Sequence, residues 1–327
     1  MMERLLAKVQ INDERVLLGP RIGGDAALID YGNNVLVAKT DPVTFATDLI
    51  GWYAVQVNAN ELACTGACPR WFLATLLVPE TFTEAEAEAV FDQILQACNS
   101  LGITLVGGHS EVTRGLSHPM VIGCMLGEVE KGKLVHTGVA KDGDSIVVTK
   151  GIALEGTALL AREAGESLAG SGVNAGTIAR AKELLFYPGI SVLKDAHIAC
   201  SNVKVNALHD PTEGGLVTGL WEISKAAGVG LAIEEGSIPI LPECTEICQA
   251  LGLDPLGLMA SGALLITLPP EDVPQLFLAL EKEGIEAFEI GQITGSEDGV
   301  RMISTSSHEL EHLPQFERDE LARFLSQ

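Results

Sequence analysis

Acidic and amide side chains next to glycine or proline recur along this 327-residue chain, and they are the residues best suited to holding a metal ion. Oxygen atoms of Asp, Glu and Asn are the ligands that Mg²⁺ prefers, and glycines allow a ligand to approach the backbone. Five segments have this character: Gly23-Gly24-Asp25, Thr40-Asp41-Pro42, Asn58-Ala59-Asn60-Glu61, Gly107-Gly108-His109-Ser110-Glu111 and His209-Asp210-Pro211-Thr212-Glu213-Gly214-Gly215. Together they predict sites for cations and phosphates.

The first two segments each place one carboxylate at a break in local structure. Asp25 follows two glycines, and Asp41 is expected at the end of a strand, where Pro42 would stop further pairing. Each has a purely structural alternative, because Gly-Gly-Asp is a common turn and an Asp before Pro can cap one.

The third segment lies within a predicted helix over residues 52–65. Asn58, Glu61 and Thr65 are three and four residues apart, so they share one face of that helix. Such a face would meet a metal or phosphates, and the alternative is an ordinary solvent-facing surface.

The fourth and fifth segments follow predicted strands at residues 103–106 and 205–208. His109 and Glu111 come directly after Gly107-Gly108, and either could assist as a base. Asp210 precedes a helix predicted over residues 212–227, whose free N–H groups would attract phosphate. Asp210 could hold a cation beside them, or serve only as the N-cap.

Composition excludes several classes of function. The formal net charge of −23 disfavours binding to nucleic acid and to anionic membranes, and no apolar run is long enough to span a bilayer. Seven scattered cysteines favour a reducing cytoplasm, and Cys64/Cys68 and Cys244/Cys248 lack the pattern of a zinc site. A Walker A loop and a Gly-x-Gly-x-x-Gly fingerprint are both absent, so any nucleotide site is of another kind.

The length of the chain predicts two domains, and the break at Asp142-Gly143-Asp144 places their boundary near residue 140, so the domains are expected over residues 1–140 and 141–327. The first is expected to be α+β with a mixed sheet, with strands at 26–29, 35–40, 71–78, 103–106 and 120–129, and helices at 52–65 and 83–101. Thr83 and Glu86 have the spacing of a capping box at the start of the second helix. The second domain is expected to be richer in helix, with strands at 145–149, 205–208, 263–268 and 285–290 between the helices.

The five segments, in this order, resemble the superfamily of aminoimidazole ribonucleotide (AIR) synthetase, carbamoyl dehydratase HypE, selenophosphate synthetase and thiamine-monophosphate kinase. His209 to Gly215, Ile238-Pro239 and Leu253 to Leu256 look most like HypE. The resemblance implies an N-terminal, ferredoxin-like mixed-sheet domain that pairs in a homodimer, and a C-terminal α/β sandwich domain.

The resemblance also implies ATP and Mg²⁺ as cofactors. The matching positions assign the metal to Asp25, Asp41, Glu61 and Asp210, and the nucleotide to Gly24, Asn60, Gly107, Gly108, Thr212, Gly214 and Gly215. Two positions depart from the family: Glu61 falls where relatives carry Asp, and His109 falls where relatives carry Asp or Glu.

The activity expected from the resemblance is transfer of the γ-phosphoryl group of ATP to an amide or carboxyl-like oxygen. The acceptor would be a small molecule or a thiol or amide group of a protein. HypE ends in a reactive cysteine, whereas the sequence has none after Cys248, so a reaction on its own tail is not expected. The alternatives are a plain small-molecule kinase and a non-catalytic nucleotide-binding assembly factor.

Overall fold

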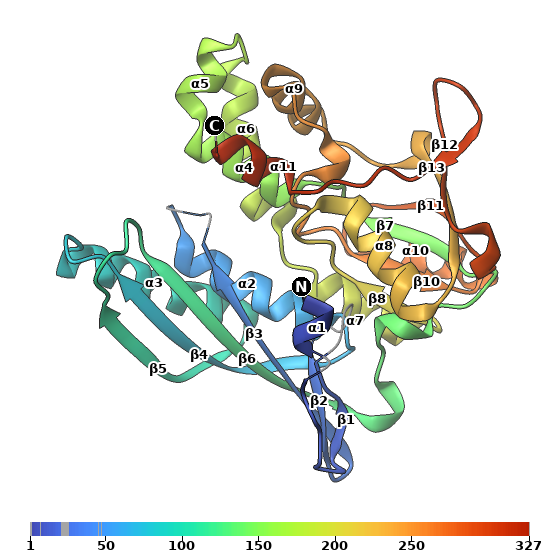
Figure 1. Cartoon of the computed structure of the whole chain (residues 1–327), viewed down its shortest axis with the longest axis horizontal. Coiled ribbons are helices and arrows are strands. Elements are labelled where there is room, and N and C mark those ends of the chain that lie inside the picture. The colour runs from blue at the N-terminus through green and yellow to red at the C-terminus, as the bar shows by residue number, and fades with distance from the viewer. Residues whose placement is uncertain (1, 7, 21–25, 45, 47, 327) are drawn as a thin grey trace. The chain divides into compact units, whose positions relative to one another are not determined.

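The structure is a computed structural model that describes residues 2–6, 8–20, 26–44, 46 and 48–326 (Figure 1). The chain divides into two compact units, the first ending at Leu134 and the second beginning at Val135. This division comes before the expected one near residue 140, because the short helix η2 (Thr137–Val139) packs on elements of the second unit.

The first unit is built on a six-stranded sheet in the order β1-β2-β3-β6-β4-β5. Its strands are β1 (Val16–Leu18), β2 (Ala27–Tyr31), β3 (Asn34–Val43), β4 (Cys68–Val78), β5 (Thr104–Val112) and β6 (Met120–Glu130). β4 and β5 pair in parallel, and β6 lies between β3 and β4, antiparallel to both. The unit β3-α2-β4 is therefore a split βαβ, the feature expected of a ferredoxin-like mixed sheet.

Two helices, α2 (Ile50–Ala63) and α3 (Glu84–Leu101), pack against each other and against this sheet (Figure 1); a short helix, α1 (Met2–Leu6), begins the chain. The predicted capping box is present, since Thr83 and Glu86 exchange hydrogen bonds at the start of α3. α2 approaches β6 closely because two residues of that strand are glycines. A Cβ atom on Gly123 would lie 2.3 Å from Nδ2 of Asn58, and one on Gly127 would lie 2.8 Å from Leu62.

Two strands of the first unit continue through the proline or glycines at which they were predicted to end. β3 continues through Pro42 to Val43, paired with β6. β2 pairs with β3 only as far as Ala38, so the missing N–H of Pro42 costs no hydrogen bond with β2. β5 continues through Gly107 and Gly108 to Val112, still paired with β4. The polar residues predicted to follow these strands therefore lie within them.

The second unit has a seven-stranded sheet in the order β13-β12-β9-β11-β7-β10-β8. Its strands are β7 (Ser145–Thr149), β8 (Ala207–His209), β9 (Gly230–Glu234), β10 (Leu265–Leu268), β11 (Ala287–Thr294), β12 (Val300–Ile303) and β13 (Leu310–His312). Every residue of β7 is buried, so both faces of the sheet are covered there, as in an α/β sandwich. β9, β12 and β13 were not predicted.

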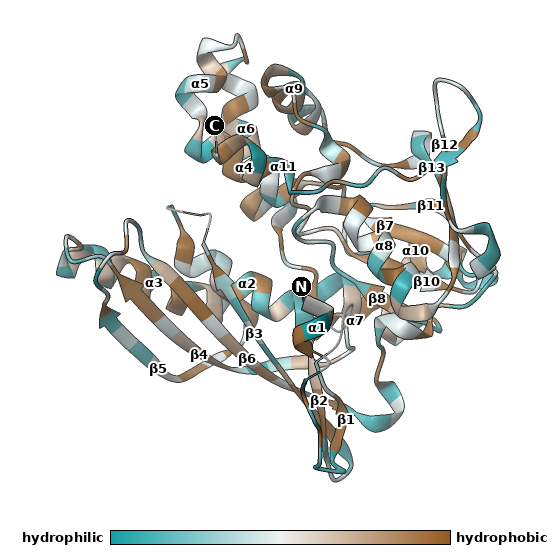
Figure 2. Cartoon of the chain, in the orientation of Figure 1, coloured by the Kyte–Doolittle hydropathy of each residue, from teal (hydrophilic) through white to brown (hydrophobic). Residues whose placement is uncertain are grey.

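The helices of the second unit are α4 (Leu154–Glu163), α5 (Gly165–Gly170), α6 (Ala175–Glu183), α7 (Leu193–Asn202), α8 (Gly215–Ala227), α9 (Pro242–Leu251), α10 (Val273–Glu281) and α11 (Glu320–Leu325). Figure 2 shows apolar residues along the strands of both sheets and along these helices. Among the described residues, no helix has the length and apolarity needed to cross a bilayer.

Candidate functional site

Helix α2 carries polar side chains at positions that are fully inside the first unit. Asn58 and Asn60 are 0% exposed and Glu61 is 6% exposed. The solvent-facing alternative for this segment is therefore wrong. Thr65, predicted to share the face, is also buried, but it lies beyond the last residue of the helix. Burying amides and a carboxylate costs free energy unless they are hydrogen-bonded, ion-paired or used by a ligand.

Strand β3 supplies the other half of this polar region. Val35 and Val37 of β3 are buried, and by the alternation of a strand Lys39 and Asp41 share their side, which faces α2. The backbone carbonyl of Asp41 accepts a hydrogen bond from Nδ2 of Asn58 at 3.2 Å. We call Lys39, Asp41, Asn58 and Glu61 the β3–α2 junction.

The junction contains a close ion pair. Nζ of Lys39 lies 3.0 Å from Oε1 of Glu61, and the two side chains are 21% and 8% exposed respectively. Oδ1 of Asn58 is buried and has no hydrogen-bond partner among the described residues. With two carboxylates and one ammonium, the four side chains have a formal charge of −1.

The junction fits a cation only in part. The carboxylates of Asp41 and Glu61 are of the ligand type that Mg²⁺ prefers, and that of Glu61 also forms the ion pair with Lys39. Gly24 and Asp25 lie outside the described residues. Within those residues, no three acidic, histidine or cysteine side chains come together as a metal site. Among the described residues of the first unit, the structure thus brings the predicted ligands Asp41 and Glu61 to one junction.

His109 and Glu111 lie elsewhere in the first unit. β5 is an edge strand of the sheet, and β4 and β6 lie between it and β3, so β5 and β3 are about 14 Å apart at the usual strand spacing. Both side chains are more than half exposed, and Nε2 of His109 lies 3.6 Å from Oε2 of Glu111. Glu111 lines a groove of about 530 Å³ between α3 and β5.

The second of the two glycines before them, Gly108, has a packing role. A Cβ atom on Gly108 would lie 1.9 Å from the carbonyl oxygen of Ala74 on β4, so the close pairing of β5 with β4 requires glycine at this position. Gly108 therefore has a structural reason that is independent of nucleotide binding.

In the second unit, the loop before α8 does not have the predicted geometry. Asp210 is 2% exposed, and the N-cap of α8 is Gly214, in a left-handed conformation. The N–H of Gly214 donates to Oδ2 of Asp319 at 2.6 Å, so a carboxylate of the chain occupies one of the groups predicted to attract phosphate. The Thr212 carbonyl accepts the N–H groups of Gly215 and Ala260.

Asp210 and Glu213 of the fifth segment belong to a cluster of acids with Glu155 and Asp319, two residues that the sequence analysis missed. Glu155, in the first turn of α4, is buried, and burial raises its pKa to about 8; the nearby hydroxyl of Ser261 opposes this, and Glu213, Asp319 and Asp210 add to it. Burial also raises the pKa of Asp319, although the backbone N–H groups that donate hydrogen bonds to its carboxylate lower that pKa. The only sequence signal was the position of Glu155 directly before a helical glycine.

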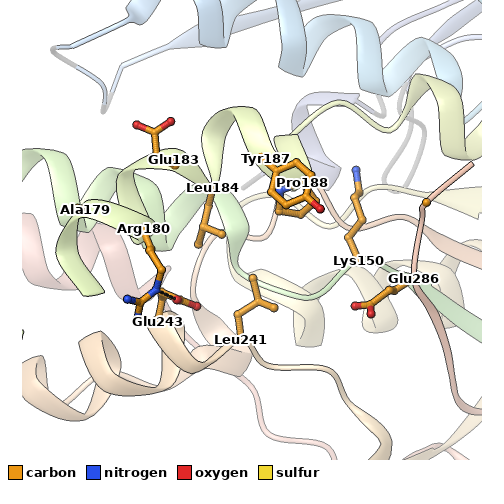
Figure 3. A pocket seen from close by; sticks show the side chains of 11 residues that line it. Lys150, Ala179, Arg180, Glu183, Leu184, Tyr187, Pro188, Leu241, Glu243 and Glu286 are labelled. Atoms are coloured by element: carbon orange, nitrogen blue, oxygen red, sulfur yellow. Dashed lines mark hydrogen bonds and ion pairs between the residues drawn. The ribbon is translucent and has the colours of Figure 1, made fainter. Parts of the chain in front are cut away.

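A separate cavity of about 630 Å³ lies in the second unit (Figure 3). Figure 3 shows the Arg180–Glu243 ion pair at one end, Lys150 and Glu286 at the other, and the apolar Leu184 and Leu241 among the residues between them. Lys150 is buried; its Nζ donates to the Ser191 carbonyl at 2.7 Å and lies 3.4 Å from Asp195. Desolvation lowers the pKa of Lys150, and Asp195 opposes the shift. None of the predicted site residues that the structure describes lines this cavity.

Comparison with known proteins covers most of the chain. Residues 23–129 match the family model of the AIR synthase related protein, N-terminal domain, and residues 141–304 match that of its C-terminal domain. A Methanocaldococcus jannaschii protein named for hydrogenase expression and formation is 28% identical over 304 residues, which are 90% of this chain and 87% of that protein.

Carbamoyl dehydratase HypE of Cupriavidus necator is 30% identical over 267 residues, covering 79% of this chain and 71% of that protein. A crystal structure of the hydrogenase maturation protein HypE in complex with ATP superimposes with a TM-score of 0.71 at 22% identity, covering 97% and 95% of the two chains. At that identity, the superposition shows the two-domain fold alone.

Proposed function

Because this chain belongs to the AIR synthase related family, we propose that it is an enzyme that binds ATP with Mg²⁺ and transfers the γ-phosphoryl group to an oxygen atom of an acceptor. The relative from C. necator is named a carbamoyl dehydratase, and the HypE structure that shares this fold contains ATP. The acceptor oxygen would belong to an amide or carboxyl-like group of a small molecule or of a protein.

The observation that carries the proposal is the β3–α2 junction. An amide and a carboxylate of α2 are buried against a strand that carries a further carboxylate and an ammonium. A packing role alone would be met better by apolar side chains, since polar groups inside a domain cost free energy. Local rules of this kind are broken most often at functional sites, where a ligand compensates for the cost.

The chain's own residues would act by binding and positioning. Asp41 would hold a cation, and Asn58 would fix the backbone of Asp41 through its hydrogen bond at 3.2 Å. Bound Mg²⁺ would neutralise charge that develops on the transferred phosphoryl group, which is the main requirement of this chemistry. Asp25, Asp210 and the glycines of both units remain proposed contributors.

The test is calorimetric titration of the protein with ATP in the presence of Mg²⁺. Asp41→Asn is expected to weaken Mg²⁺-dependent ATP binding by ~10-fold or more, because an amide replaces the charged ligand. Asp298→Asn serves as the control, because Asp298 is an exposed acid in a turn of the second unit. Equal ATP affinity in wild type and Asp41→Asn would rule out this site.

Product analysis separates the alternatives. A stable phosphorylated metabolite would identify a small-molecule kinase, and release of phosphate together with a new C–N or C–S bond would identify an acyl-phosphate type of reaction. ATP binding without turnover on any acceptor would point to the non-catalytic factor.

We also propose that the first unit pairs with its counterpart in a homodimer. Phe72, Ala74 and Leu76 of β4 are buried, whereas the alternate residues Trp71 and Leu73 lie on the opposite face and are partly exposed. β6 adds Ile122 and Leu126 to the same face. An apolar sheet face of this kind is typical of protein–protein contacts.

A further inference from the structure

The cavity of about 630 Å³ in the second unit has an apolar middle. Leu184 follows the last residue of α6 and Leu241 precedes the first residue of α9, and Figure 3 shows their side chains pointing toward each other. Tyr187 also lines the cavity and is 83% exposed, which places its ring at the rim. Apolar walls with a few polar groups around a space of this size are typical of sites for small molecules.

A buried ammonium fixes one wall of this cavity. Nζ of Lys150, directly after β7, donates to the carbonyl groups of Gly189 at 3.3 Å and Ser191 at 2.7 Å. Asp195 lies 3.4 Å from this ammonium, and the Lys150 and Asp195 side chains are only 4% and 3% exposed. These contacts hold the segment that follows Tyr187 next to β7. The wall is therefore preformed, and the charge of Lys150 is already balanced inside the protein.

The second base of the cavity is balanced as well, whereas two of its acids are not. Nε of Arg180 donates to Oε1 of Glu243, and Nη2 of Arg180 donates to the hydroxyl of Thr177 at 3.4 Å. Glu183 and Glu286 also line the cavity, and neither side chain forms an ion pair or a hydrogen bond with another described residue. The two carboxylates therefore leave the cavity with a net negative charge.

The position of Glu286 suits it to pair with a ligand in the cavity. Its side chain is exposed, and Figure 3 shows it extending toward Leu241. A carboxylate attracts an ammonium or guanidinium group, and the face of an aromatic ring such as that of Tyr187 attracts the same groups. An anion would meet the two carboxylates and no base whose charge is free. The charge of the cavity thus complements a cation with an apolar body.

We propose that this cavity binds a small organic cation. The ammonium or guanidinium group of the ligand pairs with Glu286, and its apolar body lies between Leu184 and Leu241. Glu183 adds to the negative charge that selects a cation over a neutral molecule or an anion. This ligand is additional to ATP and its acceptor, and the inference does not rest on the proposed function, because the cavity is formed by other residues than those assigned to the nucleotide and Mg²⁺.

The experiment is an NMR titration of the full chain, without ATP, in which the leucine methyl groups are labelled. The probe is phenylethylamine, compared with neutral phenylethanol and anionic phenylacetate. Phenylethylamine is expected to shift the methyl signals of Leu184 and Leu241 saturably and to leave those of Leu278, which is exposed on α10, unchanged. Its affinity should exceed that of phenylethanol by about 5-fold, the upper range for one partly exposed ion pair, and phenylacetate should bind more weakly still.

Glu286→Gln tests the residue assigned to the cation. Because Glu286 is exposed, this substitution is compatible with the fold, and it should lower the affinity for phenylethylamine by about 5-fold without changing that for phenylethanol. Glu289→Gln is the matched control, since Glu289 is an exposed acid of the neighbouring strand β11 that does not line the cavity. Phenylethylamine should bind to it as to wild type.

Three results would overturn the proposal. The first is the absence of a saturable shift of Leu184 and Leu241 with phenylethylamine. The second is an affinity of wild type for phenylethanol or phenylacetate that equals or exceeds its affinity for phenylethylamine, because the cavity would then not select a cation. The third is an equal affinity for phenylethylamine in wild type and Glu286→Gln, which would remove Glu286 as its partner.

Discussion

Glu155 shows how a single buried acid can make stability depend on pH. Its pKa is raised from 4.5 to about 8, chiefly by burial. Between these values the folded protein retains a proton that the unfolded chain has released. Rising pH therefore favours the unfolded chain over this range, and the loss of stability is complete once the pH exceeds the folded-state pKa.

Replacing Glu155 with Gln removes this titration while keeping the shape of the side chain. The free energy of unfolding of Glu155→Gln should exceed that of wild type by an amount that grows by roughly 1.4 kcal/mol per pH unit from pH 6 to pH 8, and then levels off. Urea unfolding in EDTA measures it, with the exposed Glu183→Gln as the control. A difference that does not change with pH would show that Glu155 titrates normally.

Asp319 matters at the level of elements, because it joins two helices that are far apart in the sequence. Oδ2 accepts the N–H of Gly214 at 2.6 Å, at the start of α8, and Oδ1 accepts the N–H of Leu321 at 2.7 Å, at the start of α11. Carboxylates at helix N-termini are favoured by capping hydrogen bonds and by the helix dipole. The segment near the C-terminus is therefore anchored to the loop that begins with Asp210.

Asp319→Ala should weaken this anchor by about 1–2 kcal/mol, the usual cost of losing an N-cap. Hydrogen exchange of the α11 amides should then accelerate by a factor of about 5–30. Asp272→Ala is a matched control, because Asp272 is the N-cap of α10 but makes no capping hydrogen bond with its side chain. Equal protection of α11 in Asp319→Ala and wild type would contradict the anchoring role.

The elements that sequence predicts well are those encoded by local signals. The α3 capping box is one case, and the strand over residues 120–129 is another. The Lys39–Glu61 pair could not be predicted, because it depends on how α2 lies across β3, and neither segment encodes that register by itself. Asp319 was missed for the same reason, since its partner Gly214 is 105 residues away in the chain. The error on β5 had the opposite origin: Gly107-Gly108 was interpreted as a strand end, whereas the strand continues and Gly108 allows its close pairing with β4.

At the scale of the whole molecule, the acidic composition restricts how copies of the chain can associate. A formal charge of −23 opposes contact between like surfaces, so a stable dimer requires an apolar interface with few charges. The face of the first sheet that carries Trp71, Leu73, Ile122 and Leu126 meets this requirement. β5 is the edge strand of this sheet and pairs only with β4 among the described strands.

We therefore expect light scattering after size-exclusion chromatography to give the wild-type protein a mass twice the 34.5 kDa of one chain. Leu73→Lys combined with Leu126→Lys should give monomers, because both substitutions place ammonium groups in an apolar contact where they cannot be solvated. Leu278→Lys is the control, since Leu278 is 58% exposed on α10 of the second unit. A wild-type chain that is monomeric at micromolar concentration would exclude the dimer. A double variant that remains dimeric would instead place the interface on another surface of the chain, because neither substituted leucine could then be buried between the subunits.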